Sequence, residues 1–306
     1  MSRTTVLAGG VGGARLARGL AAVIPNEDLT VIVNVGDDDR VYGAHVAADL
    51  DTVTYTLAGL EGPYGWGVAG DTFKVLAALD TFAVDTSFRL GDRNLALCLM
   101  RTEMLQNGIP LSEVTRNICA ALEVEATILP ATNDRLRTRL NTTDAGWLAF
   151  QDYFVRRQHR DKVIGLEYVG SADARPAPGV IDAISKSDTI FIAPSNPPLS
   201  IHPILAIEEI RDAVAAARRV IAVSPLFGGK ALKGPADRVM ASLGFPPGNA
   251  GVLVAYDGLL SHLVVDIADA IDADTLAGTV RIHTTDTRFA EAAAATRFAH
   301  WLLDLR

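Results

Sequence analysis

Four glycines follow a short apolar segment near the start of the chain. Thr4–Ala8 is rich in β-branched residues, which predicts a buried strand, and Leu16 and Leu20 then recur at helical spacing. Glycine lets backbone N–H groups approach a phosphate, and the amino end of the next helix adds partial positive charge. The alternative is a tight strand-to-helix turn without a ligand. We predict that four residues of this turn bind a nucleotide: Gly9, Gly10, Gly12 and Gly13.

Acidic residues follow the second predicted strand, residues 29–35. Asp37 and Asp38 should lie at the same edge as the glycine turn, because ligands of open α/β sheets bind beyond the carboxyl ends of the strands. Carboxylates beside a diphosphate need a cation between them, and Mg²⁺ prefers a few carboxylates with phosphate and water. We predict that Asp37 and Asp38 bind Mg²⁺; the alternative is a solvated acidic turn.

Charged residues also occur at two later predicted helix starts. Asp49 and Asp51 enter an apolar helical segment, where one acid can be the N-cap but two exceed what a cap needs. Arg89 and Arg93 flank a Gly-Asp turn before another helix, an arrangement that favours an anion site. The alternative for these arginines is a surface pairing with Asp92.

Several loops carry further candidate residues. Trp66 lies in a glycine-rich loop, where it can stack on a planar ring or fill the core of its own loop.

Asp71 and Asp92 are predicted N-caps of the helices that follow each of them. Two more loops come after later strands and should reach the phosphate edge. One carries Ser195 and Asn196, and the other carries Lys230 and Lys233, for which the alternative is solvated surface lysines.

The order of elements that must position these residues predicts an α/β fold. Strand and helix patterns alternate, which indicates one Rossmann-like domain over residues 1–306, with an open, mostly parallel sheet and helices on both faces. Residues from about 80 to 178 depart from the alternation and are predicted to form a mixed α+β excursion. Later segments predict a helix at 204–217, strands at 252–256, 263–267 and 280–284, and a final helix from about 286 to 305.

Composition excludes several classes of function. The net charge of −8 argues against a nucleic-acid-binding protein. No apolar run approaches the length of a membrane span, and the start of the chain lacks the layout of a signal peptide. Cys98 and Cys119 lie in apolar helical segments without metal-type spacing, so we expect buried thiols in a cytoplasmic protein.

Together these motifs resemble the 2-phospho-L-lactate transferase family of deazaflavin coenzyme F-420 biosynthesis. The resemblance implies a guanosine-diphosphate-activated donor that carries phospholactate or phosphoenolpyruvate, and 7,8-didemethyl-8-hydroxy-5-deazariboflavin as acceptor. The ribityl hydroxyl of the acceptor attacks the distal phosphorus and GMP leaves. It also implies Mg²⁺ as cofactor and a homodimer. The resemblance rests on residues 8–13, 33–38, 49–52, 90–93, 193–197 and 223–225.

Residue roles follow from the matching motifs. The resemblance implies that Asp51 and Arg89 bind the deazaflavin, that the glycine turn and the Ser195-Asn196 loop bind the nucleotide, and that Asp37 binds the metal. Phosphoryl transfer depends on positioning and charge neutralisation, for which Arg93 is a candidate. Asp51 is the first candidate for the base that takes the hydroxyl proton.

Two alternative functions fit parts of this pattern. A non-catalytic regulator that binds nucleotide sugars shares the fold and the glycine-rich first turn. An NAD-dependent oxidoreductase would instead show GxGxxG and one acid after the second strand, not a Gly-Asp-Asp cluster. The segments at residues 49–51 and 90–93 favour the transferase.

Overall fold

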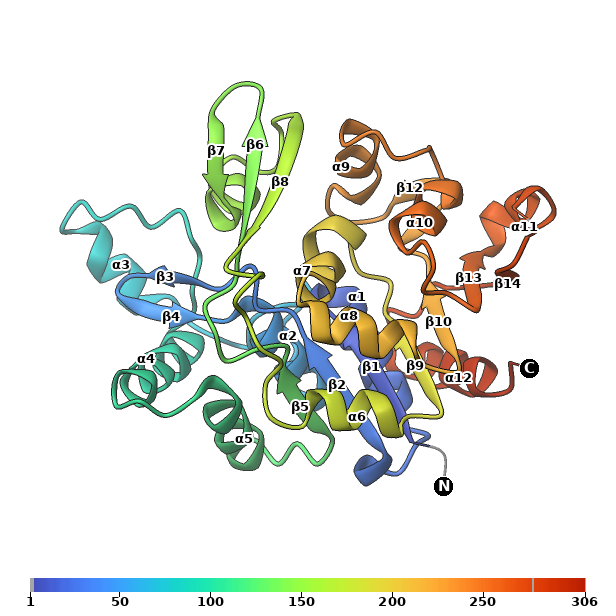
Figure 1. The fold of residues 1–306 in the computed structure, drawn as a ribbon. Coiled ribbons are helices and arrows are strands. Elements are labelled where there is room, and N and C mark those ends of the chain that lie inside the picture. Colours follow the sequence, from blue (N-terminus) through green and yellow to red (C-terminus); the bar gives the residue numbers. More distant parts are fainter. Residues whose placement is uncertain (1–2, 277, 306) are drawn as a thin grey trace.

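A parallel sheet of seven strands forms the centre of the molecule (Figure 1). The computed structural model describes residues 3–276 and 278–305. The strand order is β14-β13-β10-β9-β1-β2-β5, and every neighbouring pair is parallel, which confirms the predicted Rossmann-like sheet. The strands are β1 (Thr4–Ala8), β2 (Leu29–Val33), β5 (Thr127–Pro130), β9 (Thr189–Ile192), β10 (Val220–Val223), β13 (His262–Asp266) and β14 (Arg281–Thr285).

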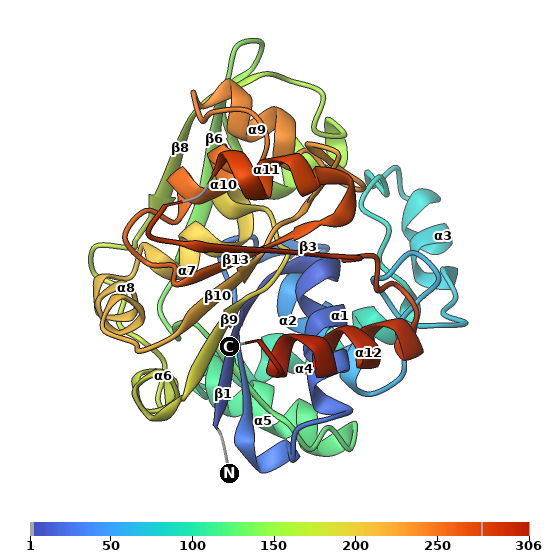
Figure 2. The ribbon, with the colours of Figure 1, turned by 90° about the vertical axis from the view of Figure 1, so that its right-hand side faces the viewer.

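Helices cover both faces of this sheet, as the alternation of elements predicted (Figure 2). On one face α1 packs between α2 and α12, and on the other face α6 packs against α8. The apolar stripe of α1, which includes Leu16 and Leu20, is buried on the sheet. The bounds are α1 (Gly10–Ala21), α2 (Ala48–Leu57), α5 (Leu111–Ala121), α6 (Val180–Lys186), α8 (Glu208–Ala215) and α12 (Ala292–Leu303).

Smaller units stand beyond the carboxyl ends of the strands (Figure 1). One is a three-stranded antiparallel sheet in the order β7-β6-β8, and another is the β3–β4 hairpin, which packs on α4. The bounds are β3 (Asp39–Val41), β4 (Ala44–Val46), α3 (Lys74–Asp80), α4 (Asp92–Gln106), β6 (Arg137–Thr142), β7 (Gly146–Ala149) and β8 (Val163–Val169). The predicted excursion at residues 80–178 contains most of these elements, but it also contains β5, which returns to the central sheet.

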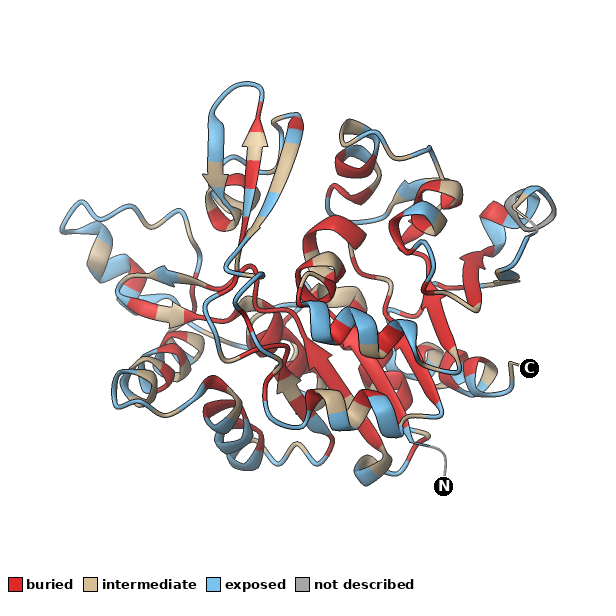
Figure 3. Cartoon of the chain, in the orientation of Figure 1, coloured by how far each residue is buried: buried red, intermediate tan, exposed pale blue. Residues whose placement is uncertain are grey.

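The central strands are buried along their length, whereas most helices expose an outer face; α2 is an exception and is buried on nearly all sides (Figure 3). Among the described residues, no helix is long and apolar enough to cross a membrane. Cys98 and Cys119 are both buried free thiols, as predicted. The remaining elements are α7 (His202–Leu205), β11 (Leu226–Phe227), β12 (Lys230–Ala231), α9 (Ala236–Ser242), α10 (Asn249–Ala255) and α11 (Ala270–Thr275).

Three element predictions were wrong. Residues 252–256 do not form a strand, because they continue helix α10. The predicted helix at 204–217 is divided into α7 and α8, and the final helix begins at Ala292 rather than near residue 286. Strands predicted near 263–267 and 280–284 are confirmed as β13 and β14.

Candidate active site

The direction of strand addition reverses between β1 and β9. From β1 the chain adds β2 and then β5 on one side, whereas β9, β10, β13 and β14 follow on the other. In open α/β sheets the ligand crevice lies outside the carboxyl ends at such a point. Gly9 follows β1 and Ser195 follows β9, and the two are hydrogen-bonded: Gly9 N donates to Ser195 Oγ at 3.3 Å, and Ser195 Oγ donates to Gly9 O at 2.7 Å. Two predicted nucleotide-binding segments therefore meet at the switch point.

The glycines of the turn serve different purposes. A Cβ on Gly12 would lie 2.3 Å from the carbonyl oxygen of Pro194, and one on Gly13 would lie 2.9 Å from Cβ of Ala8. Both positions need glycine for packing within the protein, so they are no test of nucleotide binding. Gly10 differs, because its φ of +62° lies in the left-handed region and the nearest atom to its Cβ position is 3.9 Å away. The space beside Gly10 is therefore open, although its N–H is bonded to Asp49.

Asp49 lies directly on the glycine turn. Its Oδ1 accepts a hydrogen bond of 2.7 Å from Gly10 N, and its Oδ2 accepts one of 3.0 Å from Asn34 Nδ2. Asn34 Nδ2 also reaches Asp37 Oδ1 at 3.4 Å, so one amide group joins two carboxylates from different elements. Neither Asp49 nor Asp51 caps α2, whose N-cap is Ala47.

Three carboxyl groups are buried together here: Asp37, Asp38 and Asp49. Burial raises the pKa of Asp37 well above its usual value, and the charges of Asp49 and Asp38 raise it further. Burial also raises the pKa of Asp49 to about 6, against the lowering effect of its bonds from Asn34 and Gly10 N. Ionisation of all three carboxyl groups is therefore unfavourable unless a cation lies beside them.

Asp38 gives a second sign that a cation fits this cluster. Its Oδ2 is 3.0 Å from His45 Nε2, while its buried Oδ1 has no hydrogen-bond partner among the described residues. Within that part of the chain no three His, Cys, Asp or Glu side chains are arranged to hold a metal by themselves. Mg²⁺ does not need such a set, because one or two carboxylates with substrate phosphates and water satisfy it. The residues therefore suit a Mg²⁺ ion that is bound together with a phosphate ligand.

Asp51 is engaged within the protein. Its Oδ1 forms an ion pair with Arg101 Nη2, and its Oδ2 lies 3.2 Å from Arg101 Nη1. Burial raises the pKa of Asp51, and the Arg101 charge opposes that shift. Arg101 is 2 % exposed and its Nη1 also donates to His45 O at 3.1 Å. The pair joins α2 to α4, and Arg101 also bonds the backbone of His45, whose side chain contacts Asp38.

Arg89 and Arg93 do not join Asp51 in this structure. Both are exposed; the guanidinium of Arg89 lies 4.3 Å from the ring centroid of Phe73, and Arg93 Nη1 donates to Ala69 O at 3.2 Å. The predicted pairing of these arginines with Asp92 is not what positions them. The predicted contact of Asp51 and Arg89 with an acceptor stays a prediction.

The caps of α3 and α4 are exchanged relative to the prediction. Asp71 accepts from the N–H groups of Arg93 and Asn94 at the start of α4, at 2.9 and 3.2 Å. Asp92 accepts from the N–H groups of Lys74 and Val75 at the start of α3, both at 3.0 Å. Each acid caps the helix that the other was expected to cap.

The Ser195-Asn196 loop contacts the glycine turn, whereas the loop with Lys233 contacts another loop. Asn196 Oδ1 accepts from Leu199 N at 3.2 Å, while its buried Nδ2 has no partner among the described residues. Lys233 Nζ donates to Tyr64 O at 3.4 Å, so its loop contacts the loop that carries Trp66 rather than the glycine turn. Among the side-chain polar atoms of these two loops in the described chain, the buried atom without a hydrogen-bond partner is Asn196 Nδ2, an amide donor.

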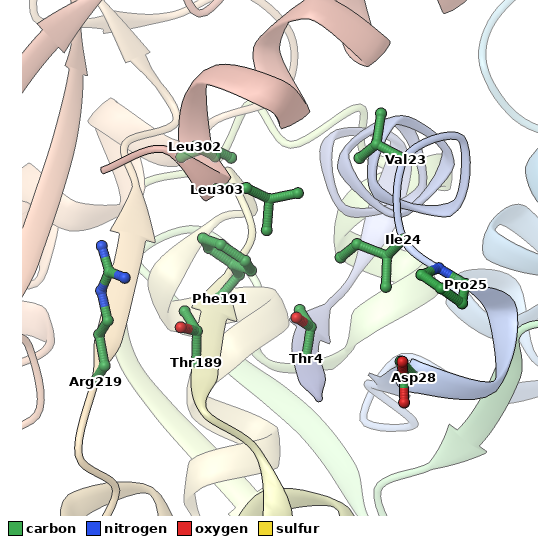
Figure 4. Close-up of a pocket in the computed structure, with 10 residues that line it drawn as sticks. All are labelled: Thr4, Val23, Ile24, Pro25, Asp28, Thr189, Phe191, Arg219, Leu302 and Leu303. Carbon is green, nitrogen blue, oxygen red and sulfur yellow. The ribbon is translucent and has the colours of Figure 1, made fainter. Parts of the chain in front are cut away.

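A cavity of about 290 Å³ lies at the opposite, amino edge of the sheet (Figure 4). Thr4 and Thr189 at the starts of β1 and β9 line it, with Phe191 and Arg219 beside them. No predicted site residue lines this cavity. We therefore place the candidate site at the carboxyl edge, where the polar groups converge.

Sequence reasoning missed Asn34, His45 and Arg101 and gave Asp49 no more than a capping role. Arg101 was detectable, because Leu95, Cys98 and Arg101 form the buried face of α4 and a charge on such a face needs a partner. Asn34 and His45 show no comparable signal, since their roles depend on elements that the fold brings together.

Comparisons with known proteins give the family of the chain. The family model described as "2-phospho-L-lactate transferase CofD" matches residues 4–296. A phosphoenolpyruvate transferase of Streptomyces griseus is 42% identical over 275 residues, 88% of this chain and 86% of that protein. A 2-phospho-L-lactate transferase of Methanococcus maripaludis is 36% identical over 271 residues, 87% of each chain.

A solved structure supports the fold alone. The crystal structure of a UPF0052 family member from Bacillus halodurans has a TM-score of 0.66 and 16% identity and covers 99% of both chains. The family model spans the glycine turn, the carboxylate cluster and both later loops, and two relatives above 35% identity carry transferase names. The chain therefore belongs to the 2-phospho-L-lactate transferase CofD family, and the carboxyl edge of its sheet is the candidate active site of a transferase.

Proposed function

We propose that this transferase moves a phospholactyl or enolpyruvyl-phosphoryl group from a guanosine-diphosphate-activated donor to the ribityl hydroxyl of 7,8-didemethyl-8-hydroxy-5-deazariboflavin, with release of GMP. The reaction belongs to coenzyme F-420 biosynthesis, and the proposal includes Mg²⁺ and a homodimer. The observation that carries it is the contact between Gly10 N and Asp49 at the switch point, beside the buried Asp37 and Asp38. A glycine turn suited to phosphate and a cluster of buried carboxyl groups thus share the carboxyl edge of the sheet.

The chain's own residues supply positioning and charge. Phosphoryl transfer requires alignment of the reacting oxygens and neutralisation of charge. Asp37 and Asp38 would hold Mg²⁺, with Asp49 beside them, and the ion would neutralise phosphate charge when it is bound. The amino end of α1 directs N–H groups and partial positive charge at the phosphates. Asn34 fixes the relative positions of Asp37 and Asp49.

Asp51 has a positioning role in this proposal. Arg101 holds its carboxylate in a buried ion pair, which stabilises the ionised form and leaves it poorly placed to accept a substrate proton. Through Arg101 the pair fixes the carbonyl of His45, and the His45 ring in turn orients Asp38. Asp51 thus acts on the metal-binding cluster rather than on the hydroxyl.

The reaction is tested by incubating the purified protein with Mg²⁺, the deazaflavin and each of the two donors, followed by mass analysis of the products. We expect the mass of the phosphodiester product together with GMP. Stabilisation by UDP-sugars without any product would instead support the nucleotide-sugar-binding regulator.

The metal assignment makes a separate prediction. Asp37→Asn and Asp49→Asn should abolish most of the thermal stabilisation that GDP with Mg²⁺ gives to the wild type, because each removes a carboxylate from the cluster. At a GDP concentration of 100 times Kd, that stabilisation is about 2.7 kcal/mol. Asp39→Asn is the matched control, since the Asp39 side chain only bonds the next backbone N–H. An unchanged response in both cluster variants would exclude this metal site.

A further inference from the structure

The loop at residues 62–70, called here the aromatic loop, lies against the helix that carries the phosphate turn. A Cβ on Gly65 would be 2.6 Å from Val11 Cγ1 and 3.2 Å from Arg15 Nη2, so the loop backbone contacts the first turns of α1. Val11 is the residue directly after Gly10. A nucleotide whose phosphate binds at Gly10 would therefore have the aromatic loop as a neighbour of its base.

Further contacts tie the aromatic loop to its neighbours. Lys233 Nζ donates to Tyr64 O at 3.4 Å, and Arg93 Nη1 donates to Ala69 O at 3.2 Å. The loop thus connects the phosphate turn with the α4 start, where Arg93 was predicted to meet substrate. Two internal bonds of 3.0 Å, from Gly62 N to Gly67 O and from Gly65 N to Gly62 O, fix its shape.

This fixed loop exposes two aromatic rings. Tyr64 is 66% and Trp66 is 49% exposed, and their ring centroids are 5.8 Å apart with 26° between the planes. Trp66 therefore does not fill the core of its own loop, which was the alternative reading of the sequence. Gly65 and Gly67, on either side of Trp66, have φ of +88° and +67°, a backbone that turns the rings outward at positions where other residues are strained.

We propose that Tyr64 and Trp66 form a stacking surface for the planar heteroaromatic ring of one substrate. The inference rests on the proposed function, which offers two such rings, the guanine of the donor and the deazaflavin of the acceptor. Aromatic side chains next to a phosphate site bind such rings through their faces and tolerate variation at the ring edge. The two rings share this chemistry, and separate titrations distinguish them.

The test compares Trp66→Ala with a matched control. Trp147 on β7 is 44% exposed and lies on the separate three-stranded sheet, with the Arg139 guanidinium 5.5 Å from its ring centroid. GDP with Mg²⁺ is titrated by calorimetry, and the deazaflavin by its own fluorescence. We expect Trp66→Ala to weaken one of the two ligands by about 5- to 150-fold, Trp66→Phe to retain most of that affinity, and Trp147→Ala to change neither.

A second measurement does not depend on removing the ring. In a Trp147→Phe, Trp301→Phe double variant, Trp66 is the only tryptophan left. Its emission should change on addition of the ligand whose affinity Trp66→Ala reduces.

The outcomes separate this inference from the proposed function. Wild-type affinity for both ligands in folded Trp66→Ala overturns the stacking surface and leaves the proposed function intact. An equal loss of both ligands also overturns it, because the loop would then act through the shape of the phosphate turn. A wild-type protein that binds neither GDP nor the deazaflavin contradicts the proposed function itself and the inference with it.

Discussion

Arg101 shows how much of this site depends on one side chain that no substrate touches in the proposed arrangement. It is buried, pairs with Asp51 and donates to the carbonyl of His45. A buried ion pair gives little net stability over apolar residues of similar volume, but the loss of one partner leaves an uncompensated charge. The pair is therefore better understood as a device that fixes geometry than as a source of stability.

Arg101→Met should destabilise the protein by about 3–5 kcal/mol, because the Asp51 carboxylate then stays buried without its cation. Urea unfolding followed by circular dichroism measures the loss. The double variant Asp51→Leu, Arg101→Met should recover most of the stability but not the activity, since the contact to His45 is missing. Equal destabilisation in the single and double variants would show that the charge is not the cause.

At the scale of elements, the exchanged caps of α3 and α4 make the two helices one unit. Asp71 precedes α3 and caps α4, while Asp92 opens α4 and caps α3. Hydrogen bonds from Thr72 to Asp92 and from Arg93 to Ala69 cross the same junction. The segment that carries Arg89 is thereby held at both ends.

Asp92→Ala should therefore expose the amide hydrogens at the start of α3 to faster exchange, although Asp92 belongs to α4. Asp71→Ala should do the same for the start of α4. Hydrogen exchange with mass spectrometry resolves the two helices, and Asp85→Ala, in the connection between them, serves as a control. Faster exchange only in the helix next to the altered residue would contradict the exchange of caps.

Sequence patterns were reliable where local and tertiary preferences agree. The buried strands, helix α1 and the position of the glycine turn between β1 and α1 belong to this group. The segment at 252–256 does not, because its β-branched residues favour a strand while the fold makes it a helix. Asn249 at the start of α10 is fully buried and accepts from Ser224 Oγ at 2.5 Å, and Gly251 packs on the Pro246 carbonyl. Such tertiary contacts have no local signature, and neither does the meeting of Asn34 with Asp49.

At the scale of the whole molecule, the two edges of the sheet have opposite electrostatic character. The carboxyl edge gathers buried acids, whereas the amino edge carries basic groups around His262 on β13. His262 Nδ1 is 2.8 Å from His283 Nε2, and burial, His283, Arg219 and Arg281 together lower the pKa of His262 to about 4. The pKa of His283 is also lowered, chiefly by burial.

The lowered pKa of His262 predicts that the protein loses stability as the pH falls. In the unfolded chain His262 has a pKa near 6.5, so unfolding takes up a proton as the pH falls below that value. Its contribution to stability is complete above pH 6.5 and is lost as the pH falls from 6.5 towards 4. His262 lines an open cavity of about 520 Å³, and with solvent screening we expect a loss of about 1 kcal/mol between pH 7 and pH 5.

Urea unfolding at several pH values between 7.5 and 5 measures this slope. His262→Asn should flatten the curve in that range, while His300→Asn on α12 should leave it unchanged. An identical slope in wild type and His262→Asn would assign the acid sensitivity to other groups.

The position of β1 between β2 and β9 has a consequence for synthesis. β2 follows β1 after a single helix, but the partner on the other edge, β9, ends at Ile192. The ribosome must add most of two hundred residues before that edge can be filled, and until then a flat, apolar strand edge stays open to other chains. The β1–β9 pair therefore forms late in synthesis, and the strand ends on either side of the switch point come together only then. A nascent chain stalled before β9 is thus expected to need a chaperone and to lack the candidate active site.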